Sequence, residues 1–269
     1  MPAKSLLNSS LWSLCLCGQI CLAKTTTEAR RHRNRTLTIQ LSSDDLNNTG
    51  SLPSKKAATR TATRGMFPQW ALELLRPMVG VVSRVFWQIE FLGVENIPAQ
   101  GGVIIAANHQ TYIDPFWLSL KIKRPIRYLA WSAAFRWPLV GPCLRWLGAW
   151  PLALEGSDPA AIRRSLQWLR DGGAVVIFPE GGRSTSTGAL ERFKAGAVRL
   201  ALEANVPILP VTIKGGNRIW PRGWRLPHLG KVVVTYHPLY LPEQPPDQET
   251  RAFARRESDR LARVIESAL

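Results

Sequence analysis

Cysteine is scarce in this sequence, and the four cysteines are poorly placed for a structural role. Three of them crowd together at Cys15, Cys17 and Cys21, and Cys143 stands alone. No Cys-x-x-Cys pair occurs and no histidine stands beside the trio, which argues against a zinc site and against a disulfide scaffold. The chain also lacks the Gly-x-Ser-x-Gly turn that exposes a nucleophilic serine. We therefore expect no metal, no other cofactor and no serine nucleophile of that kind.

Acidic residues are also in short supply. The chain has 35 Lys and Arg against 19 Asp and Glu, a formal net charge of +16, and its pI is near 10.6. A field of this sign attracts polyanions, which leaves nucleic acid, an anionic lipid surface or a phosphorylated substrate as partners. Residues 1–65 carry +7 and residues 66–269 carry +9. Eleven tryptophans suit the lipid surface, because Trp favours sites with one apolar and one wet side, although Trp also fills ordinary cores.

The first part of the chain has no sustained helical or strand period. Residues 1–65 are rich in Ser, Thr, Asn and Arg, which predicts a disordered leader, or a wrongly chosen start with Met66 as the natural first residue. A signal peptide fits Ser5–Ala23 poorly, because polar residues break its apolar region. A transit peptide is a further alternative.

Residues 66–92 form a second segment, which is rich in apolar side chains. Four charged residues interrupt its apolar stretch, Ala71–Phe91, too many for a comfortable transmembrane span of about 20 residues. We expect an amphipathic helix that lies in a membrane interface with its apolar side down. A helix packed on the core of its own domain fits the pattern equally well.

Beyond Gly93 the sequence alternates between short β-branched runs and helical segments. This alternation predicts an α/β fold, with a mixed, largely parallel sheet flanked by helices and the interfacial helix N-terminal to it. Asp158 and Pro159 supply an N-cap and a first-turn proline for one of the helices. The expected strands are 103–107, 126–130, 174–178, 208–213 and 232–236, and the expected helices are 115–122, 159–170, 189–204 and 248–269.

His109 and Asp114 follow the first predicted strand, and strand ends in open α/β sheets are where sites collect. A separation of five residues is about 140° around a helix, so we expect a loop that folds back, with Asp114 at a helix N-cap and Pro115 opening the helix. The carboxylate would then contact one imidazole nitrogen and stabilise the protonated ring. From the spacing alone, a helix-capping Asp and an ordinary loop His are the favoured alternatives.

A glycine turn follows another predicted strand. Gly181 and Gly182 allow backbone N–H groups to approach a ligand, and Arg183 offers a planar fork suited to phosphate oxygens. Lys194 adds a second cation near a helix. The alternatives are an ordinary tight turn with exposed charges and a solvated lysine.

Taken together and in this order, these segments resemble the lysophosphatidic acid acyltransferase family (1-acyl-glycerol-3-phosphate acyltransferases). The resemblance runs from about Phe86 to Tyr240 and assigns residues 93–269 to an acyltransferase domain. Four blocks in register make it specific. The family's Asn-His-x-x-x-x-Asp matches Asn108–Asp114, its Phe-Pro-Glu-Gly-x-Arg-Ser matches Phe178–Ser184 with Gly182 where Thr is usual, its Phe-Lys-x-Gly matches Phe193–Gly196, and its Val-Pro-x-x-Pro-Val matches Val206–Val211.

The resemblance implies transfer of a fatty acyl group from acyl-CoA or acyl carrier protein to the hydroxyl of a lysolipid. With 1-acyl-glycerol-3-phosphate as the acceptor, the product is phosphatidic acid, a step of phospholipid synthesis. In this mechanism His109 is the general base, Asp114 polarises it, and no acyl-enzyme forms. The residues expected to bind the acceptor are Glu180, Gly181, Arg183 and Lys194.

One residue departs from the family pattern. Leu154 stands where the family has an Arg that helps to hold the acceptor's phosphate, so another lysolipid, such as a lyso-ornithine lipid, is an alternative acceptor. Outside enzymes, the alternatives are a basic nucleic-acid-binding protein and a catalytically idle lipid-binding protein. The loop Lys214–Lys231 interleaves basic and aromatic residues, which suits an anionic membrane or single-stranded nucleic acid. Because lipid substrates are implied, we expect a membrane partner, no nucleic acid, and a peripheral or monotopic position on the cytoplasmic face.

Overall fold

The structure is a computed structural model that describes residues 69–138, 140–153, 158–185, 187–221, 223–243 and 249–269. The predicted leader 1–65 and the departure at Leu154 lie outside the described residues, so what we expect of them stays a prediction.

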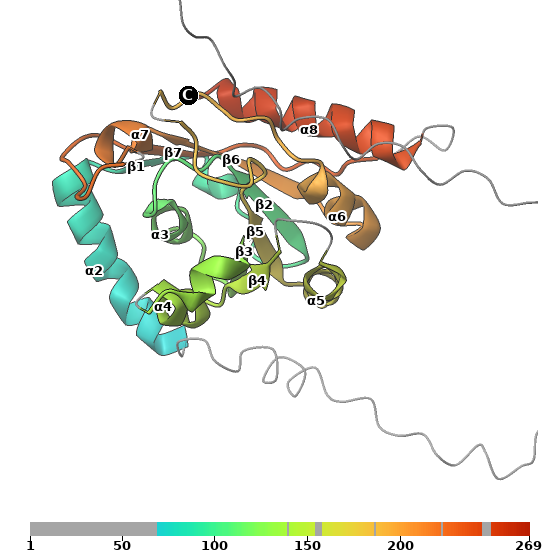
Figure 1. Cartoon of the computed structure of the whole chain (residues 1–269), viewed down its shortest axis with the longest axis horizontal. Helices are drawn as coiled ribbons and strands as arrows, with labels where there is room; N and C mark the ends of the chain where they lie inside the picture. The colour runs from blue at the N-terminus through green and yellow to red at the C-terminus, as the bar shows by residue number, and fades with distance from the viewer. Residues whose placement is uncertain (1–68, 139, 154–157, 186, 222, 244–248) are drawn as a thin grey trace, which may run out of the picture. The chain divides into compact units, whose positions relative to one another are not determined.

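Seven strands form one sheet in the order β1-β7-β6-β2-β5-β3-β4 (Figure 1). Neighbouring strands are parallel except for β6 and β7, which are antiparallel. The predicted α/β fold with a mixed, largely parallel sheet is therefore confirmed. The strands are β1 (Glu90–Leu92), β2 (Val103–Ala107), β3 (Ile126–Trp131), β4 (Trp150–Leu152), β5 (Ala174–Ile177), β6 (Ile208–Lys214) and β7 (Val233–Tyr236).

Helices cover both faces of the sheet. Helices α2, α3 and α4 lie on one face, and helices α5, α6 and α8 lie on the other (Figure 1). A short α7 follows β6, and two 3-10 helices, η1 and η2, follow β1 and β3. The helices are α2 (Gln69–Trp87), α3 (Asp114–Ser119), α4 (Val140–Trp146), α5 (Pro159–Arg170), α6 (Gly196–Ala204), α7 (Gly216–Ile219) and α8 (Thr250–Glu266), with η1 (Val94–Asn96) and η2 (Ser132–Arg136).

The central strand β2 is buried along its whole length and divides the apolar core in two. Ile105 belongs to the cluster that contains Trp117 of α3, whereas Ile104 belongs to the cluster that contains Val198 of α6 and Leu261 of α8. Successive strand residues point to opposite faces, so a parallel strand covered on both sides reads as an unbroken apolar run. This burial fixes the end of β2, and therefore the start of the segment that carries His109.

Some helix and strand boundaries differ from the expectations. The predicted helix 189–204 begins only at Gly196, because the preceding segment is hydrogen-bonded back to the glycine turn: the Glu191 N–H donates to the Glu180 carboxylate and the Lys194 N–H donates to the Pro179 carbonyl. The Asp158 cap of α5 is as predicted, since its carboxylate accepts from the Ala161 N–H at 2.9 Å. Strands β1 and β4 and helix α4 were not predicted.

Helix α2 turns much of its apolar surface away from the core. Its buried side meets the protein through Ser83 and through Trp87, whose ring packs edge-on against Trp117 at 5.4 Å. No helix among the described residues is long and apolar enough to span a membrane. The exposed large apolar side chains of α2 are Leu74, Leu75, Met78, Val81, Val82, Val85 and Phe86.

Candidate active site

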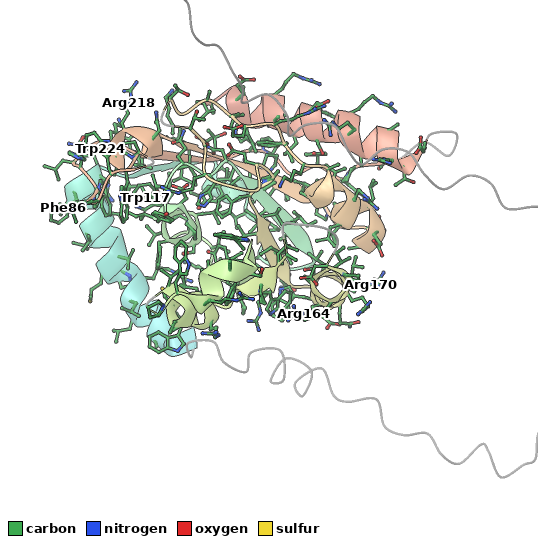
Figure 2. The ribbon with its side chains drawn as sticks, viewed as in Figure 1. Phe86, Trp117, Arg164, Arg170, Arg218 and Trp224 are labelled. Atoms are coloured by element: carbon green, nitrogen blue, oxygen red, sulfur yellow. The ribbon has the colours of Figure 1, made fainter. Side chains whose placement is uncertain are left out.

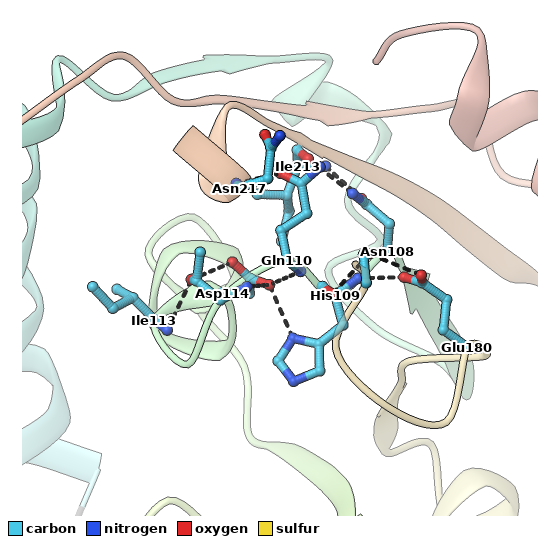
Figure 3. Close-up of polar contacts among 10 residues, drawn as sticks. Asn108, His109, Gln110, Ile113, Asp114, Glu180, Ile213 and Asn217 are labelled. Atoms are coloured by element: carbon cyan, nitrogen blue, oxygen red, sulfur yellow. Dashed lines mark hydrogen bonds and ion pairs between the residues drawn. The ribbon is translucent and has the colours of Figure 1, made fainter. Parts of the chain in front are cut away.

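The segment after β2 folds back on itself and brings Asp114 against His109 (Figure 3). Nδ1 of His109 lies 2.9 Å from Oδ2 of Asp114, so the contact predicted from the sequence is present. The Asp114 side chain is fully buried and also accepts from the backbone N–H groups of Gln110 at 2.6 Å and Thr111 at 2.8 Å. Its second oxygen accepts from the Thr111 hydroxyl at 2.7 Å.

The capping role expected for Asp114 is wrong in detail. Helix α3 starts at Asp114, its N-cap residue is Ile113, and no side chain caps it. The carboxylate instead holds the preceding loop. Pro115 stands in the first turn of α3, as predicted.

These hydrogen bonds fix the tautomer of His109. Oδ2 of Asp114 already accepts two backbone N–H donors and so acts as an acceptor in this loop, which makes Nδ1 of the imidazole the donor in the third contact. The neutral ring therefore keeps its lone pair on Nε2, which has no hydrogen-bond partner among the described residues. The ring of Phe178 stacks on the imidazole with centroids 4.2 Å apart and planes 22° from parallel. Nε2 is thus the nitrogen that can accept a proton.

Glu180 clamps the backbone of His109. Its carboxylate, 7% exposed, accepts from the His109 N–H at 2.7 Å, the Ser184 hydroxyl at 2.8 Å and the Glu191 N–H at 3.0 Å. The Ser184 N–H in turn donates to the His109 carbonyl at 2.7 Å. Burial raises the pKa of the Glu180 carboxyl above its ordinary value, while these hydrogen bonds oppose the shift. The role predicted for Glu180 in binding the acceptor stays a prediction; its contacts here are with the protein.

A pair of hydrogen bonds from Asn108 joins the end of β2 to β6. The side-chain amide of Asn108 donates to the Ile213 carbonyl at 2.8 Å and accepts from the Ile213 N–H at 2.7 Å (Figure 3). Asn108 is fully buried. Its two hydrogen bonds continue the ladder between the strands by one more residue and set where His109 leaves the sheet.

The two cations predicted at the site have different surroundings at the glycine turn. Gly181 has a φ of +75°, a left-handed conformation that favours glycine, and a Cβ there would collide with the end of the Lys194 side chain. Lys194 therefore lies directly over the turn. Arg183 stacks on the ring of Tyr112, its guanidinium carbon 3.7 Å from the ring centroid. Because Tyr112 belongs to the loop that joins His109 to Asp114, Arg183 lies against that loop.

The same combination of fold and motifs occurs in known proteins. Residues 88–214 match the model of the Acyltransferase family. The chain is 30% identical over 162 residues to a chloroplastic 1-acyl-sn-glycerol-3-phosphate acyltransferase of Brassica napus, which covers 58% of this chain and 46% of that protein. It is 31% identical over 133 residues to the Bacillus subtilis 1-acyl-sn-glycerol-3-phosphate acyltransferase, covering 48% and 65% of the two chains.

A solved structure agrees with these matches. The 1-acyl-sn-glycerophosphate acyltransferase of Thermotoga maritima superposes with a TM-score of 0.53 and 25% identity, over 78% of this chain and 86% of that one. These matches support the resemblance of this chain to the lysophosphatidic acid acyltransferase family. The resemblance seen in the motifs is thereby confirmed. The alignment spans less than half the length of the Brassica napus relative.

Three residues of the site were not given a role from the sequence. Phe178 stacks on the imidazole, Asn108 anchors the strand end, and Tyr112 carries Arg183. All three stand inside or beside the recognised motifs, so their position was a usable signal. Their partners were not readable, because those partners belong to strands and loops far along the chain.

Proposed function

We propose that the protein transfers a fatty acyl group from a thioester to the hydroxyl of a lysolipid, with 1-acyl-glycerol-3-phosphate as the acceptor and phosphatidic acid as the product. The observation that carries this proposal is the 2.9 Å contact between His109 and Asp114, which leaves Nε2 of the imidazole as a base. The thioester is an acyl-CoA or an acyl carrier protein. The names and folds of the relatives support the same reaction.

In the proposed step, Nε2 of His109 takes the proton of the acceptor hydroxyl as its oxygen attacks the thioester carbonyl carbon. A C–O bond forms and the C–S bond breaks, and the proton passes from the imidazolium to the departing thiolate. Asp114 stabilises the imidazolium, and because its carboxylate is held by three further hydrogen bonds it needs no reorganisation during the step. Positioned proton transfer of this kind contributes about 10²–10⁴-fold to rate.

The head group of the acceptor is proposed to bind beside the glycine turn. Arg183 and Lys194 supply two positive charges there, and the left-handed Gly181, which has no Cβ, leaves room for the end of the Lys194 side chain. No carboxylate among the described residues forms an ion pair with either cation. Two such cations suit a phosphate monoester, because Arg presents a planar fork and Lys a compact charge.

A panel of acceptors tests this function. Purified protein receives labelled acyl-CoA, and in a parallel series acyl-loaded carrier protein, with 1-acyl-glycerol-3-phosphate, a lyso-ornithine lipid and a monoacylglycerol. We expect ester formation with the phosphate-bearing acceptor. Product only from the lyso-ornithine lipid would show that this lipid, and not 1-acyl-glycerol-3-phosphate, is the acceptor. No transfer to any of the three acceptors would contradict the proposal.

We also propose that the protein lies peripherally or monotopically on an anionic membrane surface, on its cytoplasmic face. The exposed apolar side of α2 ends next to the loop that follows α7: the Trp87 indole donates to the His228 carbonyl at 3.0 Å, and the Gly230 N–H donates to the Phe86 carbonyl at 3.3 Å. Figure 2 shows Phe86 and Trp224 on the same side of the molecule. Exposed Trp224 and Leu226 and the net positive charge match the interface of an anionic bilayer.

A further inference from the structure

The guanidinium of Arg183 is held by one aromatic side chain. Its carbon lies 3.7 Å from the centroid of the Tyr112 ring, and Nη2 donates to the Tyr112 hydroxyl at 2.9 Å. A cation over the face of an aromatic ring is attracted by the ring quadrupole, and the hydrogen bond adds an orientation to that attraction. One aromatic residue thus sets both the height and the rotation of the arginine.

Tyr112 is itself held from the other side. The Trp220 ring meets it edge-on, with centroids 5.6 Å apart and planes at 75°. The Trp220 indole donates to the Trp224 carbonyl at 2.9 Å, and the Trp220 N–H donates to the Gly216 carbonyl at 3.0 Å, so this ring is fixed as well. Arg183, Tyr112 and Trp220 form an array that extends from the glycine turn to the loop after α7.

Tyr112 is not part of the hydrophobic core, whereas Trp220 packs against it. Tyr112 is 50% exposed, and its ring belongs to neither apolar cluster. The stability of the fold therefore gives no reason for an aromatic residue at this position. The stack and the single hydrogen bond use one N–H of Arg183 and one face of its plane, which leaves the remaining donors along its edge for an anion.

We propose that Tyr112 is a specificity-determining residue, which positions Arg183 for the phosphate of the acceptor and so favours phosphate-bearing acceptors over neutral ones. This inference rests on the proposed function. A long side chain such as Arg loses much rotamer entropy when it binds a ligand, and a residue that fixes it beforehand removes part of that cost. Tyr112 therefore lowers the KM for a phosphate-bearing acceptor without taking part in proton transfer.

Kinetics of Tyr112→Leu and Tyr112→Phe test the proposal, with 1-acyl-glycerol-3-phosphate and monoacylglycerol as acceptors. Tyr112→Leu removes the ring and the hydroxyl, and we expect its KM for the phosphate-bearing acceptor to rise about 5- to 30-fold. Tyr112→Phe keeps the ring, so a rise of about 2- to 5-fold is expected. The kcat, the KM for acyl-CoA and the KM for monoacylglycerol stay within about twofold, a pattern that general unfolding would not produce.

A double-mutant cycle with Arg183→Gln decides whether Tyr112 acts through Arg183. In the Arg183→Gln background, Tyr112→Leu is expected to add no further rise in KM. If Tyr112→Leu raises KM as much in that background as in the wild type, or leaves KM unchanged when made alone, the proposal for Tyr112 is overturned. Activity of the wild type would still support the proposed function in either case. Calorimetric titration with 1-acyl-glycerol-3-phosphate measures the affinity of the same four proteins for the acceptor without turnover. A failure of the proposed function is therefore distinguishable from a failure of the proposal for Tyr112.

Discussion

The backbone of His109 is held from both sides by Glu180 and Ser184, whereas side chains such as Val81 and Val85 of α2 lie largely exposed. In the first region, buried polar groups find partners within the protein and leave one nitrogen available. In the second, apolar groups are turned away from the core and contribute little to it. The surroundings of His109 therefore hold one side chain in a fixed geometry, whereas α2 presents an apolar surface that the described residues do not cover. Each of the following substitutions alters one of these two regions.

His109→Ala is expected to have the largest effect. It removes the proposed base but leaves Asp114 with its three other hydrogen bonds. We expect kcat to fall about 10²–10⁴-fold, with the acceptor KM and vesicle binding unchanged. Single-turnover kinetics with labelled acyl-CoA measure the loss, and the thermal midpoint checks the fold. Wild-type turnover in this variant would refute the proposed mechanism.

Glu180→Gln weakens the hydrogen bonds that hold the His109 backbone but keeps the imidazole itself. The amide offers one acceptor oxygen, and its NH₂ group cannot accept from the donors that face it. Because a small displacement of a catalytic group can cost about 10²-fold, we expect a fall in kcat of that order with little change in acceptor KM.

The matched control for this change is Glu191→Gln. Glu191 meets the clamp through its backbone N–H, and its side chain is exposed, so the same loss of charge should leave kcat near the wild-type value. A rise in acceptor KM with unchanged kcat in Glu180→Gln would instead show that Glu180 binds the acceptor, as its motif predicts.

The double substitution Val82→Asp and Val85→Asp breaks the other side of the comparison. Both side chains are exposed on α2, so the fold should persist, while two charges on the apolar side should weaken binding to anionic vesicles about 10- to 100-fold. Flotation with liposomes of stated anionic lipid content measures this. Ile162→Asp on α5, another exposed apolar position, is the control and should bind as the wild type does. Equal vesicle binding by all three proteins would contradict the membrane proposal.

Much of the fold was predictable because its signals are local. The five predicted strands are all present, since most of them are short runs rich in β-branched residues, and the Asp158 cap marks the start of α5. Strands β1 and β4 are three residues long, too short for a pattern, and β4 has Pro151 at its centre. The antiparallel pairing of β7 with β6 depends on packing that no local pattern records.

The site was predictable in its residues and less so in its contacts. The motifs located His109 and Asp114, and five residues of loop sufficed to join them. Glu180 shows the limit: its residue type fits an acceptor-binding role, but the structure directs its carboxylate to the His109 N–H. Sequence spacing gives no sign of such a contact, because it forms only when β5 lies beside β2.

The clamps around His109 also bear on how the protein folds. The hydrogen bonds of Asn108 with Ile213 join residues 105 positions apart, and the bond from Glu180 to the His109 backbone spans 71 positions. Contacts this distant carry a large loop-closure entropy and form slowly. Because the Asn108 bonds form only where β6 lies beside β2, the geometry of the proposed base depends on the assembled sheet and not on the loop alone.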